Sequence, residues 1–271
     1  MKKTAVYFSI MGIFSLVNLV AQFNFDTVPK TLSAYYIAKN QPLMGLSQKL
    51  KENGFEILAE TEVLKDKIIL TISNNELKNT NSYLATLHLL VNNVENEIRV
   101  QNPSYFAAAY LQENYKYGQF RKTLYALEQV LGKMYESKDI YEFSKLAHFQ
   151  FLLGMPYLQD TRAIRESQNF THPLNEKKIG KNIAYTLKLP NGSILVGHKL
   201  RRRVHQFLTK IHQCENAQIL PYESIIQNGK VSILNPKYYL ALSLPLLDLN
   251  TFMKIASSPD AIENAIKRAY Q

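Results

Sequence analysis

The chain lacks most of the features that identify an enzyme class from sequence. It has 271 residues, with one cysteine and no tryptophan. A single cysteine excludes an intrachain disulfide and a cysteine-rich metal site. No phosphate-binding glycine loop, no HExxH zinc motif and no GxSxG nucleophile motif occurs. We therefore expect no cofactor and no metal. The composition, 46% hydrophobic and 20% charged, is that of a folded globular protein.

Charged residues are also missing from a long stretch near the N-terminus. After Lys2 and Lys3, no charged residue occurs until Asp26, and the apolar run ends at the small residue Ala21. This order predicts a secretory signal peptide over residues 1–21 and a periplasmic or secreted protein without a transmembrane domain. The alternative is an uncleaved helix that anchors the protein to the inner membrane, because the uncharged run approaches spanning length.

Positive charge exceeds negative charge over the whole chain. Lys and Arg number 32 and Asp and Glu 22, which gives a formal net charge of +10. An excess of this size favours contact with anions. In an exported protein we expect the partner to be a small anionic ligand or an envelope component and not a nucleic acid. A homodimer is a further arrangement that we consider.

Two segments of the chain resemble one another. Residues 97–111 align with residues 230–244 at an offset of 133, and five of the fifteen positions are identical. The identical pairs are Asn102/Asn235, Pro103/Pro236, Tyr105/Tyr238, Ala108/Ala241 and Leu111/Leu244. We therefore expect two tandem copies of one unit. The first is placed at residues 30–139, a linker at 140–180 and a shorter second copy at 181–271.

The local patterns predict an α+β protein. Runs rich in β-branched and apolar residues predict strands over 31–38, 55–63, 67–73, 83–91 and 97–101, and in the second copy over 183–189, 193–198, 217–226 and 230–234. Each Asn-Pro pair predicts a helix start, because Asn caps a helix well and Pro suits its first position. Further helices are expected from Leu43, Phe120, Leu200 and Ser258.

The order of these elements resembles a known bacterial family, the domain of unknown function numbered 302. The Gly54-Phe55-Glu56-Ile57 segment and the two Asn-Pro pairs carry the resemblance. In the second copy no Gly-Phe pair precedes Ile219. The resemblance implies two TBP-like units of β-α-β4-α order, each an antiparallel sheet packed on helices. It implies no reaction, cofactor or catalytic residue.

Two groups of residues are candidates for a ligand site. The first is the pair of helix starts at Asn102, Pro103, Asn235 and Pro236, where backbone N–H groups can face an anion. The second is the basic run of Lys199, Arg201, Arg202 and Arg203. Plain capping and a solvated basic face are the simpler interpretations of each. The hypothesis is a binding cleft between the two copies that uses both groups.

Other roles stay open at this point. An enzyme of unrecognised class could use Glu60, Glu62 or His88, since paired carboxylates and histidines serve acid–base chemistry. We consider a non-enzymatic role better supported, because no complete catalytic motif is found. A purely structural envelope protein is the third alternative.

Overall fold

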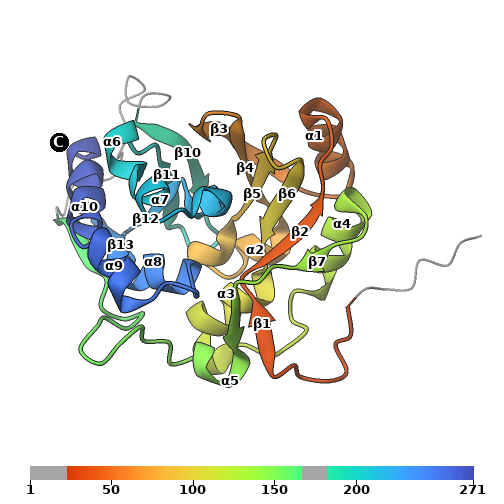
Figure 1. Ribbon diagram of the computed structural model, residues 1–271, viewed down its shortest axis with the longest axis horizontal. Helices are drawn as coiled ribbons and strands as arrows, with labels where there is room; N and C mark the ends of the chain where they lie inside the picture. Colours follow the sequence, from red (N-terminus) through yellow and green to blue (C-terminus); the bar gives the residue numbers. More distant parts are fainter. Residues whose placement is uncertain (1–22, 167–181) are drawn as a thin grey trace, which may run out of the picture.

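The computed structural model describes residues 23–166 and 182–271, and the predicted signal peptide therefore lies outside the described residues. The protein is of the α+β class, as predicted, with antiparallel sheets and helices. Two large sheets lie side by side, each with its own helices (Figure 1). We call residues 31–146 the first half and residues 162–269 the second half.

The first half is built on a six-stranded antiparallel sheet. Its strands, from one edge to the other, are β3 (Glu56–Leu64), β4 (Lys67–Ser73), β5 (Leu87–Asn92), β6 (Glu97–Gln101), β2 (Tyr35–Lys39) and β7 (Tyr135–Glu136). A separate two-stranded sheet pairs β1 (Thr31–Ser33) with β8 (Ile140–Glu142). The predicted strand over 31–38 is thus divided at Ala34 between two sheets.

The second half is built on a five-stranded antiparallel sheet. Its strands, in spatial order, are β10 (Ile183–Lys188), β11 (Ile194–His198), β12 (Tyr222–Gln227), β13 (Lys230–Ile233) and β9 (Arg162–Glu166). The segment that we expected to link the halves, residues 140–180, therefore supplies an edge strand to this sheet. Residues 167–181 of that segment lie outside the described residues.

Five strands have the same order in both sheets. In each, four strands that follow one another in the chain are neighbours, and the strand that precedes them pairs with the last of the four. The first sheet has one further strand, β7, beyond β2. A helix with an Asn cap follows the last of the four strands in both halves. These helices are α3 (Pro103–Tyr110) and α8 (Pro236–Ser243), and each begins at the predicted proline.

The remaining helices lie around the two sheets and between them. In the first half they are α1 (Leu43–Glu52), α2 (Asn75–Lys78), η1 (Tyr83–Ala85), η2 (Gln112–Asn114), α4 (Arg121–Leu131) and α5 (Phe143–Leu146). In the second half they are α6 (Arg202–His205), α7 (Phe207–Lys210), η4 (Cys214–Ile219), α9 (Leu249–Lys254) and α10 (Ser258–Ala269). Helix α1 contacts β3 and α4, while α10 contacts β9, α8 and α6.

Two predicted strands begin later than expected. Residues 83–85 form the 3-10 helix η1, because the Ser82 side chain accepts a hydrogen bond from the Leu84 N–H and closes a turn. Residues 217–219 likewise belong to η4, and β12 starts only at Tyr222. Pro221 stands between them and has no N–H to donate to a ladder. By contrast, β4 and β6 have the predicted bounds.

In each half, one segment that connects two strands packs against the sheet of the other half. The segment between β11 and β12 ends in η4, which packs on β3, β4, β5 and β6 of the first sheet. The segment between β4 and β5 ends in η1, which packs on β12 of the second sheet. Tyr83 of η1 donates a hydrogen bond to the Ser232 carbonyl over 3.1 Å. The two halves therefore share one interior.

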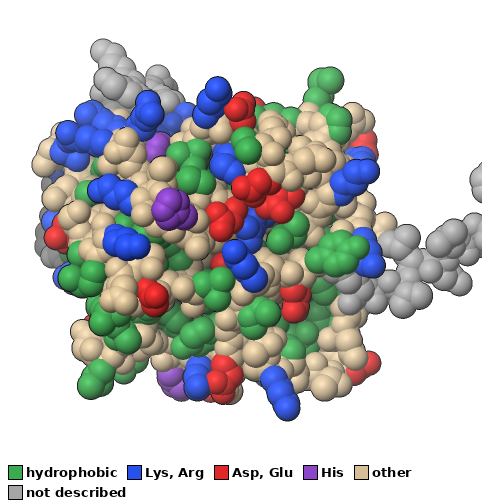
Figure 2. Space-filling view, in the orientation of Figure 1, with side chains coloured by type: hydrophobic (Ala, Val, Ile, Leu, Met, Phe, Trp, Pro, Cys, Tyr) green, Lys and Arg blue, Asp and Glu red, His purple; other side chains and the backbone are tan. Residues whose placement is uncertain are grey.

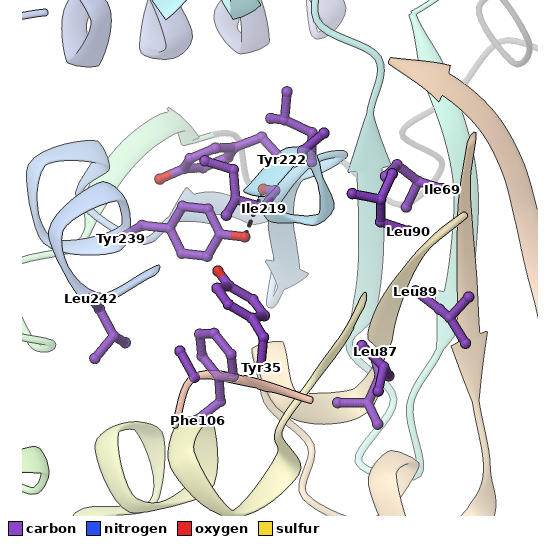
Figure 3. Packing of buried hydrophobic residues seen from close by; sticks show 14 of the residues in the cluster. Tyr35, Ile69, Leu87, Leu89, Leu90, Phe106, Ile219, Tyr222, Tyr239 and Leu242 are labelled. Carbon is purple, nitrogen blue, oxygen red and sulfur yellow. Dashed lines mark hydrogen bonds between the residues drawn. The ribbon is translucent and has the colours of Figure 1, made fainter. Parts of the chain in front are cut away.

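The shared interior is rich in tyrosine. Buried apolar residues of both halves form one continuous cluster. Tyr35 of β2 and Tyr239 of α8 point toward one another in this cluster (Figure 3). Tyr35 donates a 2.7 Å hydrogen bond to the Ser243 carbonyl, and Tyr239 donates one of the same length to the Ile219 carbonyl. Each buried hydroxyl is thus satisfied by a backbone group, as burial of a polar group requires.

Candidate functional site

The Asn102 helix start is closed inside the protein. Asn102 is fully buried, and its side-chain oxygen accepts a hydrogen bond from the Ser104 N–H over 3.0 Å. Its side-chain amide donates to the Ser33 carbonyl over 2.8 Å. Pro103 is buried as well. This helix start therefore has the capping role of the simpler interpretation, and no ligand can reach it in this structure.

The second helix start lies nearer the surface. Asn235 caps α8 by accepting a hydrogen bond from the Lys237 N–H over 3.1 Å, and Pro236 is buried. Asn235 and Lys237 line a depression together with Arg162 and Asp160. None of the residues of the predicted basic run lines this depression. The structure therefore does not bring the two helix starts and the basic run together in one cleft.

The four basic residues of the predicted run point to different places. Lys199 and Arg201 line a small cavity against α10. Arg202 lines a groove between the two halves. Arg203 is exposed and lines neither. The run thus divides between two sites, of which the groove is much the larger.

The groove has a volume of about 690 Å³. One wall is the end of β3 and its turn into β4, and the other wall is α6 and α7. The lining residues are Glu62, Val63, Leu64, Lys65, Arg202, His205, Gln206, Thr209 and Lys210. This volume lies within the range of small-molecule sites in proteins. The groove therefore lies between the first half and the second half.

The groove combines apolar and basic groups. Val63 is almost fully buried and Leu64 half-buried, whereas the cationic side chains of Lys65, Arg202 and Lys210 are exposed. Glu62 is the one acidic residue of the lining. Figure 2 shows Lys and Arg side chains gathered over the side of the molecule where α6, α7 and α10 lie in Figure 1. Three cationic side chains beside two apolar ones, against one acidic side chain, favour an anionic ligand with an apolar part.

His205 adds an ionisable group to this lining. Burial lowers the pKa of its imidazole below the usual value, and the nearby Arg202 charge lowers it further, while a hydrogen bond with the Leu200 backbone opposes both. The ring is therefore neutral near pH 7. An anion bound beside it would counteract Arg202 and raise the pKa of His205.

The residues of the enzyme alternative do not form a site. Glu60 pairs with Leu70 across the β3–β4 ladder, and His88 pairs with Thr71 across the β4–β5 ladder. Because neighbouring residues of a strand point to opposite faces, Glu60 and His88 lie on opposite faces of the sheet. Glu60 and Glu62 are exposed at the outer edge, whereas His88 is buried.

His88 instead belongs to a buried polar cluster between the halves. Its Nδ1 lies 2.9 Å from the Gln218 carbonyl oxygen, and its Nε2 lies 3.8 Å from Oε1 of Glu223. Thr86 and Tyr185 both donate hydrogen bonds to that same Glu223 oxygen. Burial lowers the pKa of His88 to about 4 and raises that of Glu223 to about 7. The close approach is therefore not a buried ion pair of full charges near neutral pH.

His88 and Glu223 occupy equivalent positions of the two sheets. Val100 pairs with Leu89 on β5, and its counterpart Ile233 pairs with Ser224 on β12. The residues that precede Leu89 and Ser224 are His88 and Glu223. His88 of the first half and Glu223 of the second half thus contact one another from equivalent positions of the two sheets.

Sequence reasoning missed most of the groove. It singled out Arg202 and Glu62 but not Val63, Leu64, Lys65 or Lys210. These residues come from two segments about 140 positions apart, and no local spacing connects them. The pairing of Glu223 with His88 was missed for the same reason.

The described residues 23–166 and 182–271 contain no cluster of three or more His, Cys, Asp or Glu side chains that could hold a metal ion. No helix among them has the length and apolarity needed to cross a membrane. No family model, no curated protein and no solved structure matches this chain. The function therefore has to be inferred from the site itself.

Proposed function

We propose that this protein is an exported, non-enzymatic binding protein that holds a small anionic, partly apolar ligand in the groove between its halves. The observation that carries the proposal is the composition of the groove wall. Lys65, Arg202 and Lys210 surround an apolar floor in a space of about 690 Å³. Cations at the rim would orient the anionic group, and Val63 and Leu64 would contact the apolar part.

The order of five strands that both sheets share supports a further part of the proposal, that the halves are copies of one TBP-like unit. From β2 to α3 the first half follows the β-α-β4-α order of the family that the sequence resembles. A groove at the junction of two copies is a common place for a ligand. Export would bring such a groove into contact with small anions of the envelope.

A fluorescent anion can test the groove directly. We would titrate the protein with 8-anilinonaphthalene-1-sulfonate, which joins an apolar ring system to one sulfonate. Arg202→Glu should weaken binding about tenfold, which corresponds to about 1.4 kcal/mol. Arg203→Glu is the matched control, because it makes the same charge change one residue away and outside the groove. Equal binding by both variants would show that the groove is not the site where the anion binds.

The natural ligand and the export step need a separate measurement. Native mass spectrometry of protein from its own host would reveal a bound small molecule as a mass that disappears on denaturation. The mass of the chain itself tests cleavage after Ala21. A chain that begins at Met1 would contradict the proposed signal peptide.

An exposed apolar area favours a second candidate function, attachment to another envelope protein. Leu249 and Met253 of α9 are exposed, as are Leu246 and Leu153. The rings of Phe151 and Phe252 contact one another with their centroids 5.3 Å apart and their planes tilted by 43°, which holds the 151–153 loop against α9. Sedimentation velocity of the wild type and of Leu153→Asp would show whether this area mediates self-association. If the wild type is a monomer at all concentrations, this apolar area does not mediate self-association, and its partner under this second candidate is a different protein.

A further inference from the structure

A second, smaller cavity lies on the basic side of the protein, apart from the groove. It has a volume of about 30 Å³ between the end of β11 and helix α10. Its lining residues are Asn182, His198, Lys199, Leu200, Arg201, Ala265, Arg268 and Ala269. A water molecule needs roughly 10–15 Å³, so the cavity has room for at least two. This is the space that the head of a small oxyanion takes.

The described residues place charges of one sign around the cavity. Lys199, Arg201 and Arg268 line it, and none of the acidic residues in 23–166 and 182–271 does. In the described part of the chain, Arg201 and Arg268 form no ion pair. Two guanidinium groups that face one cavity repel one another, and an anion between them would remove that repulsion. Planar guanidinium groups also match the geometry of phosphate oxygens.

A buried histidine forms the inner end of the cavity. His198 is 1% exposed, and its Nε2 lies 2.8 Å from the Ser224 hydroxyl oxygen and 3.3 Å from that of Tyr270. The other ring nitrogen, Nδ1, is buried without a hydrogen-bond partner among the described residues. Burial lowers the pKa of His198 to about 3, so the ring is neutral and carries a single N–H.

The Ser224 and Tyr270 hydroxyls allow that N–H to be at Nδ1. The two hydroxyl oxygens lie 2.7 Å apart, so one donates to the other and the second remains able to donate to Nε2. Nε2 then accepts, and Nδ1 carries the proton. A buried N–H donor without a partner costs about 1–3 kcal/mol, which a ligand oxygen would offset.

We propose that this cavity binds a phosphate group, either inorganic phosphate or the phosphate end of a small monoester, with Arg201 and Arg268 as its charged contacts and His198 at its inner end. The site is distinct from the groove of the proposed function, and neither Arg201 nor Arg268 lines the groove. The two proposals can therefore fail independently.

The test is thermal unfolding in phosphate against chloride at equal ionic strength and pH. Inorganic phosphate at 10 mM should raise the melting temperature of the wild type and should not raise that of Arg201→Gln/Arg268→Gln. Arg203→Gln is the matched control and should respond like the wild type. Both changed arginines are exposed, so the double variant should fold. Glycerol 3-phosphate in a parallel series separates the two sources: a larger shift than that of inorganic phosphate assigns the site to a monoester.

An NMR measurement gives a second readout that does not depend on stability. With ¹⁵N-labelled histidine, phosphate should shift the Nδ1 signal of His198 in the wild type and not in the double arginine variant.

A melting temperature that rises equally in wild type and double variant would overturn the proposal. So would a wild type that responds to phosphate no more than to chloride.

Discussion

The two halves have one strand order but fill the face between them with different residues. On the first sheet, one row across the strands contains Ala59, Thr71 and His88. The equivalent row of the second sheet contains Tyr185, Gly197 and Glu223. In the second row the Tyr185 ring lies across Gly197, and its hydroxyl reaches Glu223.

This difference shows that two similar units can share one interior only when their facing side chains differ in size. Close packing leaves no room for the same large side chain from both sides. The first half contributes short residues and His88, and the second half fills the remaining space with Tyr185. The order of five strands is common to both halves, while the complementarity between the halves comes from the different side chains in the two equivalent rows.

The largest predicted effect concerns an ion pair that only the first half contains. Arg99 donates a hydrogen bond to Asp139 over 2.9 Å, and both side chains are buried. The position equivalent to Arg99 in the second half is Ser232. Asp139→Ala should lower the free energy of unfolding in urea by about 3–5 kcal/mol, because the buried Arg99 guanidinium then keeps only the more distant and partly exposed Glu97 carboxylate, at 3.9 Å. The double variant Arg99→Met/Asp139→Leu should recover most of the loss; no recovery would contradict this explanation.

The second prediction tests the pair of equivalent residues His88 and Glu223. The raised pKa of Glu223 means that the folded protein holds its proton more tightly than the unfolded chain, so its stabilising effect is present below pH 4.5 and is lost as the pH rises through about 7. The stability of Glu223→Gln relative to wild type should therefore rise by about 3 kcal/mol between pH 4.5 and pH 8.

Comparison of the variant with wild type at each pH removes the opposite contribution of the histidines. His88 has a lowered pKa, so its effect is a loss of stability as the pH falls from 6.5 through about 4, in both proteins. Thr86 and Tyr185, which donate to Glu223, are also common to both. Parallel curves for the two proteins over this range would show that Glu223 ionises normally.

The third prediction concerns the glycine beneath Tyr185. A Cβ atom at Gly197 would lie 2.1 Å from a ring carbon of Tyr185, far inside contact distance. Gly197→Ala should therefore lower the free energy of unfolding by about 2–3 kcal/mol. Gly45→Ala is the control, because nothing lies within 4 Å of its Cβ and the residue is inside α1. That variant should gain up to about 1 kcal/mol from helix propensity.

The smallest predicted effect distinguishes the two helix caps. Asn102→Ala removes both a cap and the hydrogen bond to the Ser33 carbonyl, at a fully buried site. Asn235→Ala removes only the cap on the Lys237 N–H, at a buried position that borders a depression. We expect losses of about 2 and about 1 kcal/mol, measured by urea unfolding. Equal losses would mean that the two caps are energetically equivalent despite their different surroundings.

The strands and caps with local signals could be predicted from sequence. Residues 67–73 and 97–101 are apolar runs of strand length, and the Asn-Pro pairs combine two helix-start preferences. Strand β9 was missed because Arg162-Ala-Ile-Arg-Glu166 is a charged edge strand and carries no apolar run. Its position depends on pairing with β13, which no local pattern encodes.

The candidate sites were harder to predict than the strands. The offset of 133 that relates the Asn-Pro pairs would match His88 with Pro221 and not with Glu223. The turn between β5 and β6 has two more residues than that between β12 and β13, so the offset is 135 before these turns. The groove and the small cavity join segments whose closeness arises only from tertiary packing.

The contact between His88 and Glu223 has a consequence for how such a protein can be encoded. In a symmetric dimer of identical chains, a position that meets its own equivalent always meets the same side chain, so histidine would face histidine or glutamate would face glutamate. Two buried carboxylates side by side cannot both ionise, and two buried imidazoles do not form a complementary acid and base. When one chain carries both halves, each side of the contact can change separately. A single gene can therefore hold a matched pair at a place where two copies of a shorter gene product could not.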